Sequence, residues 1–67
     1  MFIKLNNDKL INLYWLDDVQ KEDITTDGVT TYYIAYIMVN GAKTLEEYNS
    51  EASRNTAYTT LVNSLIS

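Results

Sequence analysis

The sequence contains neither cysteine nor histidine. Without cysteine, the chain can form no disulfide and no thiolate metal site. Without histidine, it lacks the commonest transition-metal ligand and the commonest general base near neutral pH. A chain of 67 residues buries only about 60% of the surface that its unfolded form exposes. Small domains usually compensate with a disulfide, a metal or a second subunit, so a second subunit is the support that we expect here.

Basic residues are few, with five lysines and arginines against nine acidic residues and a formal net charge of −4. Binding to a phosphate backbone depends on Lys and Arg, so nucleic acid and anionic membranes are disfavoured partners. No apolar run approaches the roughly 20 residues that cross a bilayer. Residues 1–8 also lack the basic region and the long apolar core of a signal peptide. We therefore expect a cytoplasmic location and no membrane contact.

Groups that could carry out catalysis are also scarce. The only two glycines stand apart in the chain, so no phosphate-cradling loop is present. The paired acids are Asp17-Asp18 and Glu46-Glu47. Neighbouring residues on a strand point to opposite faces, so neither pair converges on one ion. We interpret all four as solvated surface charges, and we expect no enzyme activity, no cofactor and no metal.

Two turn-forming dipeptides, Asp27-Gly28 and Asn40-Gly41, flank the run of strongest strand preference. Each pair is favoured in a type I′ hairpin turn, where both central residues need a positive φ. The run 29–39 between them is almost wholly β-branched or aromatic, which predicts the central strand. Its neighbouring strands are expected over residues 19–25 and 42–48. Two shorter strands are expected over residues 2–5 and 10–13, with a turn at 6–8.

The C-terminal segment changes to a helical period, because apolar side chains recur there at intervals of three and four residues. They are Tyr58, Leu61, Val62, Leu65 and Ile66. Ser50 is suited to cap the helix, and Glu51 stands favourably in its first turn. We predict a helix from about Glu51 to Leu65. The chain, residues 1–67, is then one α+β domain. It consists of a small antiparallel sheet of four to five strands, a meander, with one C-terminal helix packed on one face.

Both faces of the central strand are apolar. One face carries Tyr32, Ile34, Tyr36 and Met38, and the other carries Tyr33, Ala35, Ile37 and Val39. One amphipathic helix covers about one face of a small sheet, so the second face has no obvious cover. A two-residue turn after Val39 pairs Ala35 with Glu46. Tyr36 then pairs with Leu45 on the opposite face. Because Ala35 is small and permits close approach, we place the helix on the Ala35 face.

The Tyr36 face is then left partly open, and exposed apolar patches on small proteins usually mark contact sites. The predicted interface consists of Trp15, Tyr32, Ile34, Tyr36, Met38 and Leu45. Alternatively, Trp15, Leu16 and the N-terminal hairpin fold over this face and complete an ordinary core. If the Tyr36 face is open, we expect it to form the interface of a homodimer or of a complex with another protein.

These features favour a non-enzymatic interaction protein that self-associates through an apolar sheet face. The alternative is a nucleic-acid-linked accessory or regulatory factor, in which the tyrosines of an open sheet stack bases. That alternative requires the cations to gather on one face beside exposed tyrosines. The cations are Lys4, Lys9, Lys21, Lys43 and Arg54. A metal- or ligand-binding domain is the third alternative.

The opening F-I-K-L-N-N-D of residues 2–8, followed by I-N-L at 11–13, resembles the start of many short uncharacterised proteins. These proteins come from low-GC Gram-positive bacteria and from their phages or mobile elements. The resemblance continues through the tyrosine-rich strand, the Asn-Gly turn and the stretch 45–51 that leads into the helix. It implies a compact sheet-plus-helix fold and a phage or mobile-element origin, without an assigned activity. Asp8 stands where the first turn of these proteins usually has glycine.

Overall fold

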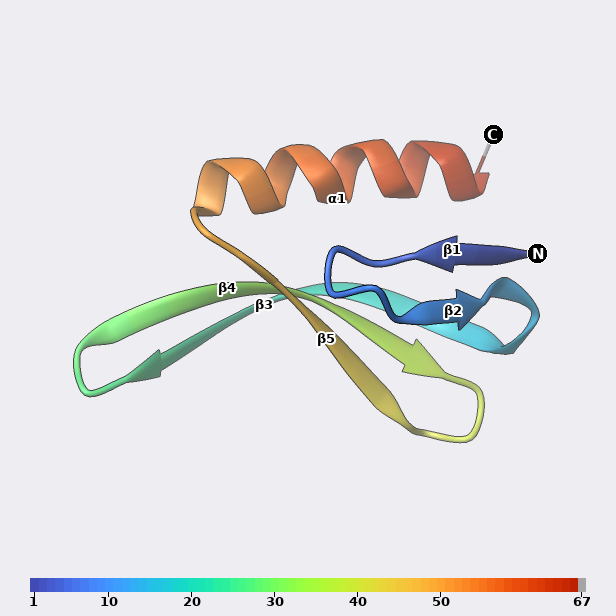
Figure 1. Cartoon of the computed structure of the whole chain (residues 1–67), viewed down its shortest axis with the longest axis horizontal. Helices are drawn as coiled ribbons and strands as arrows, with labels where there is room; N and C mark the ends of the chain where they lie inside the picture. The colour runs from blue at the N-terminus through green and yellow to red at the C-terminus, as the bar shows by residue number, and fades with distance from the viewer. Residues whose placement is uncertain (67) are drawn as a thin grey trace.

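The computed structural model describes residues 1–66, which form strands, a short 3₁₀ helix and an α-helix (Figure 1). The elements are β1 (Phe2–Lys4), β2 (Leu10–Asn12), η1 (Leu13–Trp15), β3 (Leu16–Thr26), β4 (Val29–Met38), β5 (Lys43–Tyr48) and α1 (Glu51–Ile66). β1 and β2 form a two-stranded antiparallel sheet. β3, β4 and β5 form a three-stranded antiparallel sheet with β4 in the centre. The α+β class is as predicted, but two separate sheets replace the expected single meander.

The β3–β4 hairpin closes with the two-residue turn that the sequence predicts. Thr26 pairs with Val29, and between them Asp27 and Gly28 have φ angles of 52° and 78°. Both central residues therefore lie in the left-handed region that a type I′ turn requires. The tip of this hairpin extends past Tyr32, where the pairing of β4 with β5 ends.

The β4–β5 connection has three residues, one more than predicted. The Met38 N–H donates to the Ala42 carbonyl at 2.8 Å, and the Gly41 N–H donates to the Met38 carbonyl at 2.8 Å. Residues 39–41 form the loop, in which Gly41 has a φ of 89° and Asn40 has a negative φ. A turn followed by a left-handed residue is the usual three-residue hairpin connection. The expected two-residue turn at Asn40-Gly41 is therefore wrong.

The additional loop residue shifts the register between β4 and β5 by one position. Ala35 pairs with Leu45 rather than with Glu46, and Tyr36 pairs with Thr44. Because side chains alternate along a strand, a one-residue shift moves every β5 side chain to the opposite face. Leu45 consequently shares the face of Ala35, and Glu46 lies on the face of Tyr36.

The N-terminal hairpin turns through residues 6–8. The Leu5 N–H donates to the Lys9 carbonyl at 2.8 Å, and the Asp8 N–H donates to the Leu5 carbonyl at 3.0 Å. Asp8 has a φ of 68°, which explains why glycine suits this position. Leu5 and Ile11 then point from the hairpin into the core, where both are buried.

The helix begins where the sequence predicts. Ser50 Oγ accepts a hydrogen bond from the Ser53 N–H at 3.1 Å, so Ser50 is the N-cap. The helix continues through Ile66, one residue past the predicted end. Local sequence signals therefore suffice to locate this element.

The helix and the N-terminal hairpin cover the same face of the three-stranded sheet (Figure 1). The core cluster consists of Leu5, Ile11, Ile34 and Tyr36, against which Ala57, Tyr58 and Leu61 of α1 pack. The predicted placement of the helix on the Ala35 face is therefore wrong. The Tyr36 face carries larger apolar side chains, so covering it removes more apolar area from water.

An ion pair crosses the opposite face of the sheet. Lys43 on β5 and Glu22 on β3 approach each other to 3.1 Å between Nζ and Oε1. The strand register places Ala35 midway between them, and Ala35 is buried. The small Ala35 side chain thus lies under an ion pair between the two edge strands, and not under the helix.

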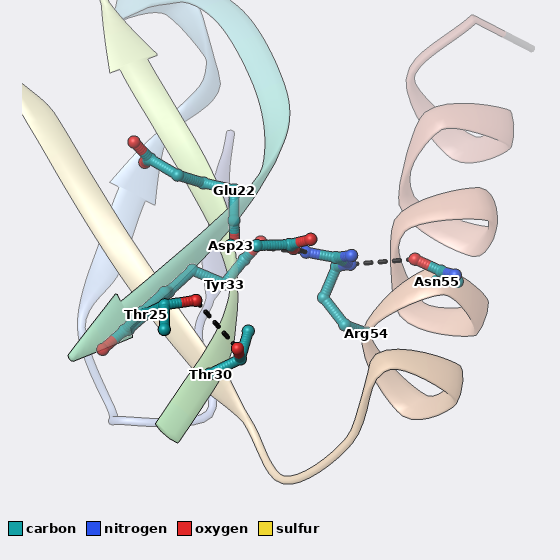
Figure 2. A network of polar contacts seen from close by, with 7 residues as sticks. All are labelled: Glu22, Asp23, Thr25, Thr30, Tyr33, Arg54 and Asn55. Carbon is teal, nitrogen blue, oxygen red and sulfur yellow. Dashed lines mark hydrogen bonds and ion pairs between the residues drawn. The ribbon is translucent and has the colours of Figure 1, made fainter. Parts of the chain in front are cut away.

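Arg54 fastens the N-terminal part of α1 to β3 and β4 (Figure 2). Its Nη1 donates to Asp23 Oδ1 at 2.7 Å and to the carbonyl oxygens of Glu22 and Tyr33, each at 3.2 Å. The guanidinium also lies 5.4 Å from the centroid of the Tyr32 ring. Only 3% of Arg54 is exposed, so this cation is part of the packed interior.

We expect Arg54→Leu to lower the free energy of unfolding by about 2–3 kcal/mol, because it removes a donor from two strand carbonyls and leaves the Asp23 carboxylate without its partner. Asp23→Asn is the control: it keeps both carbonyl contacts and an acceptor oxygen for Nη1, so it should cost less than Arg54→Leu, even though it leaves a buried guanidinium without its counter-charge. The Asp23 side chain is 48% exposed. Urea denaturation followed by circular dichroism measures both variants, and equal losses would contradict the role given to the carbonyl contacts.

Candidate functional site

The predicted interface residues do not form one exposed face. Ile34 and Tyr36 are only 1% and 2% exposed, because the helix and the hairpin cover them. Tyr32 is half-buried on the same face. Leu45 is half-buried on the opposite face, as a result of the register shift. The prediction that the Tyr36 face is open is therefore wrong. The helix and the N-terminal hairpin of the same chain cover this face.

Exposed apolar side chains instead gather at one end of the molecule, which we call the apolar end. It consists of Met1, Phe2, Leu10, Tyr14, Trp15, Val39, Leu65 and Ile66, which are between 37% and 84% exposed. The N-terminus, η1, the β4–β5 loop and the C-terminal end of α1 all lie on the right in Figure 1. The other exposed large apolar residues of the described chain, Ile24 and Val29, belong to the β3–β4 hairpin. The eight residues thus belong to elements that lie toward the same end of the molecule, away from the β3–β4 hairpin.

A cleft of about 370 Å³ opens within the apolar end. Trp15 and Met38, two residues of the predicted interface, line it together with Phe2, Leu10 and Val39. The rest of its lining is Ile11, Asn12, Asn40 and Thr44, so no charged side chain of residues 1–66 lines the cleft. Depletion of charge and enrichment in aromatic residues and Met are typical of the core of a protein–protein interface.

The short η1 helix explains why two aromatic side chains point outward at this end. Asn12 Oδ1 accepts from the Tyr14 N–H at 3.1 Å, which starts η1 directly after β2. The Val39 N–H donates to the Trp15 carbonyl at 2.8 Å, which holds η1 against the β4–β5 loop. With the backbone fixed at both points, Tyr14 remains 84% and Trp15 58% exposed.

Four of the cations are held in different places. Arg54 is a buried residue of α1 that contacts the sheet, and Lys43 pairs with Glu22 on the opposite sheet face. Lys4 engages an acid in the β1–β2 turn, and the Lys21 ammonium lies 5.4 Å from the centroid of the Tyr58 ring. A nucleic-acid surface needs cations that act together on successive phosphates. This distribution gives the nucleic-acid alternative no support.

Glu46 is a buried carboxylate, so its interpretation as a surface charge is wrong. Only 5% of it is exposed. Its Oε1 accepts from the hydroxyls of Tyr36 and Tyr48, each at 2.8 Å, and its Oε2 accepts from the Asn6 N–H at 2.8 Å. The other members of the paired acids, Asp17, Asp18 and Glu47, are exposed as predicted. Nothing local distinguishes Glu46 from these, because its burial depends on the strand register.

Burial raises the pKa of Tyr36, and the hydrogen bond to Glu46 raises it further. The same two causes, in the same order, raise the pKa of Tyr48. Deprotonation of either tyrosine would place a phenolate beside the Glu46 carboxylate in a poorly solvated site. Both tyrosines therefore stay neutral and keep donating to Glu46 above the pH at which an exposed tyrosine ionises.

Residues 1–66 contain no group of three or more Asp, Glu, His or Cys side chains placed to hold a metal ion. None of the helices in this part of the chain has the length and apolar character needed to cross a membrane. Comparisons with protein-family models, with curated proteins and with solved structures find no match.

The raised pKa values of Tyr36 and Tyr48 predict a loss of stability at alkaline pH. The tyrosines of the unfolded chain ionise first, so stability is complete below about pH 10 and falls as the pH rises further. The free energy of unfolding should fall by up to about 1.4 kcal/mol per pH unit for each tyrosine. Tyr48→Phe should roughly halve this slope, since it removes one of the two tyrosines whose pKa is raised in the folded chain. Urea midpoints measured on both sides of pH 10 test this, and a flat wild-type profile would contradict it.

Proposed function

We propose that the protein is a non-enzymatic interaction module that self-associates through its apolar end. The observation that carries the proposal is that four exposed apolar side chains of the apolar end, Phe2, Leu10, Trp15 and Val39, line one cleft that contains no charged side chain of the described residues. Scattered single apolar residues are normal on protein surfaces. A contiguous group rimmed by polar residues is typical of a contact site.

The combined exposed area of the apolar end is comparable with one side of an interface. The exposed fractions of its eight members amount to roughly 1,000 Å² at about 200 Å² for a whole large side chain. A stable protein–protein interface buries about 800 Å² on each partner.

The shape and chemistry of the apolar end suit contact with a second copy. Trp15 stands beside the cleft, and Tyr14 next to it is the most exposed apolar residue of the apolar end. In a two-fold dimer each copy supplies both the projecting aromatic groups and the cleft that receives them. Trp and Tyr are also enriched among residues that dominate binding energy. Self-association further provides the second subunit that a domain of this size commonly needs.

Val39→Glu tests this proposal, with Val29→Glu as the matched control. Val29 begins β4 and is 66% exposed, whereas Val39 directly follows the other end of β4 and is 56% exposed. Light scattering on a size-exclusion column should give twice the monomer mass for wild type and Val29→Glu at high micromolar protein. Val39→Glu should weaken the association at least about tenfold, because it places a carboxylate without a partner in a desolvated contact.

The fluorescence of Trp15, the only tryptophan, provides a second readout. Association should cover this residue and shift its emission to shorter wavelength as protein concentration rises. Val39→Glu should abolish the concentration dependence, whereas Val29→Glu should preserve it. A monomer mass at every concentration, or equal weakening by the two variants, would show that the apolar end does not mediate self-association.

A further inference from the structure

A second cleft, of about 420 Å³, lies between the N-terminal hairpin and α1. We call it the helix–hairpin cleft. The hairpin and α1 lie over the same sheet face (Figure 1), and residues of both elements line the cleft. Ile3 and Leu5 of the hairpin and Ala57 and Leu61 of the helix provide apolar walls, and Glu46 belongs to its lining.

Glu46 differs from the other buried charged residue of the described chain. Arg54 is paired with the Asp23 carboxylate at 2.7 Å, whereas Glu46 takes part in no ion pair among residues 1–66. Its hydrogen bonds come from two hydroxyls and one backbone N–H, all neutral groups. A carboxylate in apolar surroundings interacts with a cation more strongly than it does in water. The helix–hairpin cleft therefore combines apolar walls with an uncompensated negative group.

We propose that the helix–hairpin cleft binds a small organic ammonium ion, a primary amine on a short apolar body, with the ammonium group at Glu46. A carboxylate offers about four acceptor positions, of which the protein uses three, with only one of them on Oε2. An ammonium group carries three donors and gains a charge-assisted hydrogen bond there. Its apolar body then lies between the walls formed by the hairpin and the helix.

The composition of the cleft distinguishes this ligand class from a metal ion. Glu46 is the only carboxylate of the described residues that lines it, whereas calcium takes six to eight oxygen ligands, including several charged ones. Lys4 is the only cation of this lining, and its Nζ lies 3.4 Å from Asp8 with the side chain 68% exposed. Lys4 is thus directed to solvent and pairs with Asp8, so it does not neutralise the charge of Glu46. The volume lies within the range of about 300–1,000 Å³ that is usual for small-ligand sites.

Phenethylamine, which is protonated at neutral pH, and the neutral 2-phenylethanol are suitable probes, because they differ in the group directed at Glu46. Titration of the isotope-labelled full chain, followed by amide chemical shifts, measures binding at the cleft. We expect saturable shifts at residues such as Ala57 and Leu61 with phenethylamine. The alcohol should bind at least about tenfold more weakly, since it lacks the charge-assisted hydrogen bond.

Glu46→Gln and Glu47→Gln form a matched pair of variants. Glu46→Gln keeps one acceptor oxygen for the tyrosine hydroxyls but removes the charge and the second oxygen, which accepts from the Asn6 N–H. It should therefore weaken amine binding at least about tenfold. Glu47→Gln makes the same change on the exposed neighbour and should stay within about twofold of wild type, as surface charges contribute little. If phenethylamine and 2-phenylethanol bind the wild-type protein with equal affinity, that result alone overturns the proposal. Equal weakening by both variants, or no saturable shift at the cleft, would also overturn it.

Discussion

The register between β4 and β5 determines where the rest of the chain can pack. Because three residues connect these strands, Glu46 points to the face of Tyr36, where the Asn6 N–H reaches its carboxylate at 2.8 Å. The Asn6 side chain also donates to the Glu47 carbonyl at 2.7 Å. These two contacts fix the turn of the N-terminal hairpin over β5. A register shifted by one residue would turn Glu46 away from this face and remove the carboxylate that receives the Asn6 N–H.

Charged groups give direction to the packing of both elements that cover the sheet. Burial of apolar surface is non-directional, so side chains such as Leu61 permit several positions of the helix. Arg54 selects one of them, because three of its acceptors lie on β3 and β4 at fixed points. Glu46 does the same for the hairpin through Asn6. A buried polar group that must find its partners restricts the fold more than an apolar contact of equal area does.

Features determined by neighbouring residues could be predicted from the sequence, whereas features determined by register could not. The Asp27-Gly28 turn and the helix capped by Ser50 depend on residues close in the chain, and both were predicted. The pair Asn40-Gly41 suits a three-residue connection as well as a two-residue one. Because the two-residue turn was predicted, every β5 side chain was assigned to the wrong face, and Glu46 was interpreted as a surface charge. Of the predicted interface residues, Trp15 and Met38 line the cleft of the apolar end.

The apolar end is not a by-product of building the core. A two-stranded hairpin has two faces, and only one of them can meet the body of the molecule. Ile3 and Ile11 pair on the inner face, so Phe2 and Leu10 point away from the core and are 60% and 63% exposed. Replacing Phe2 and Leu10 with polar residues would reduce the apolar area buried on folding only a little, because most of each side chain is exposed to water. Their apolar character therefore contributes little to the stability of the folded chain itself, which is the physical basis for the proposal that another molecule covers this end.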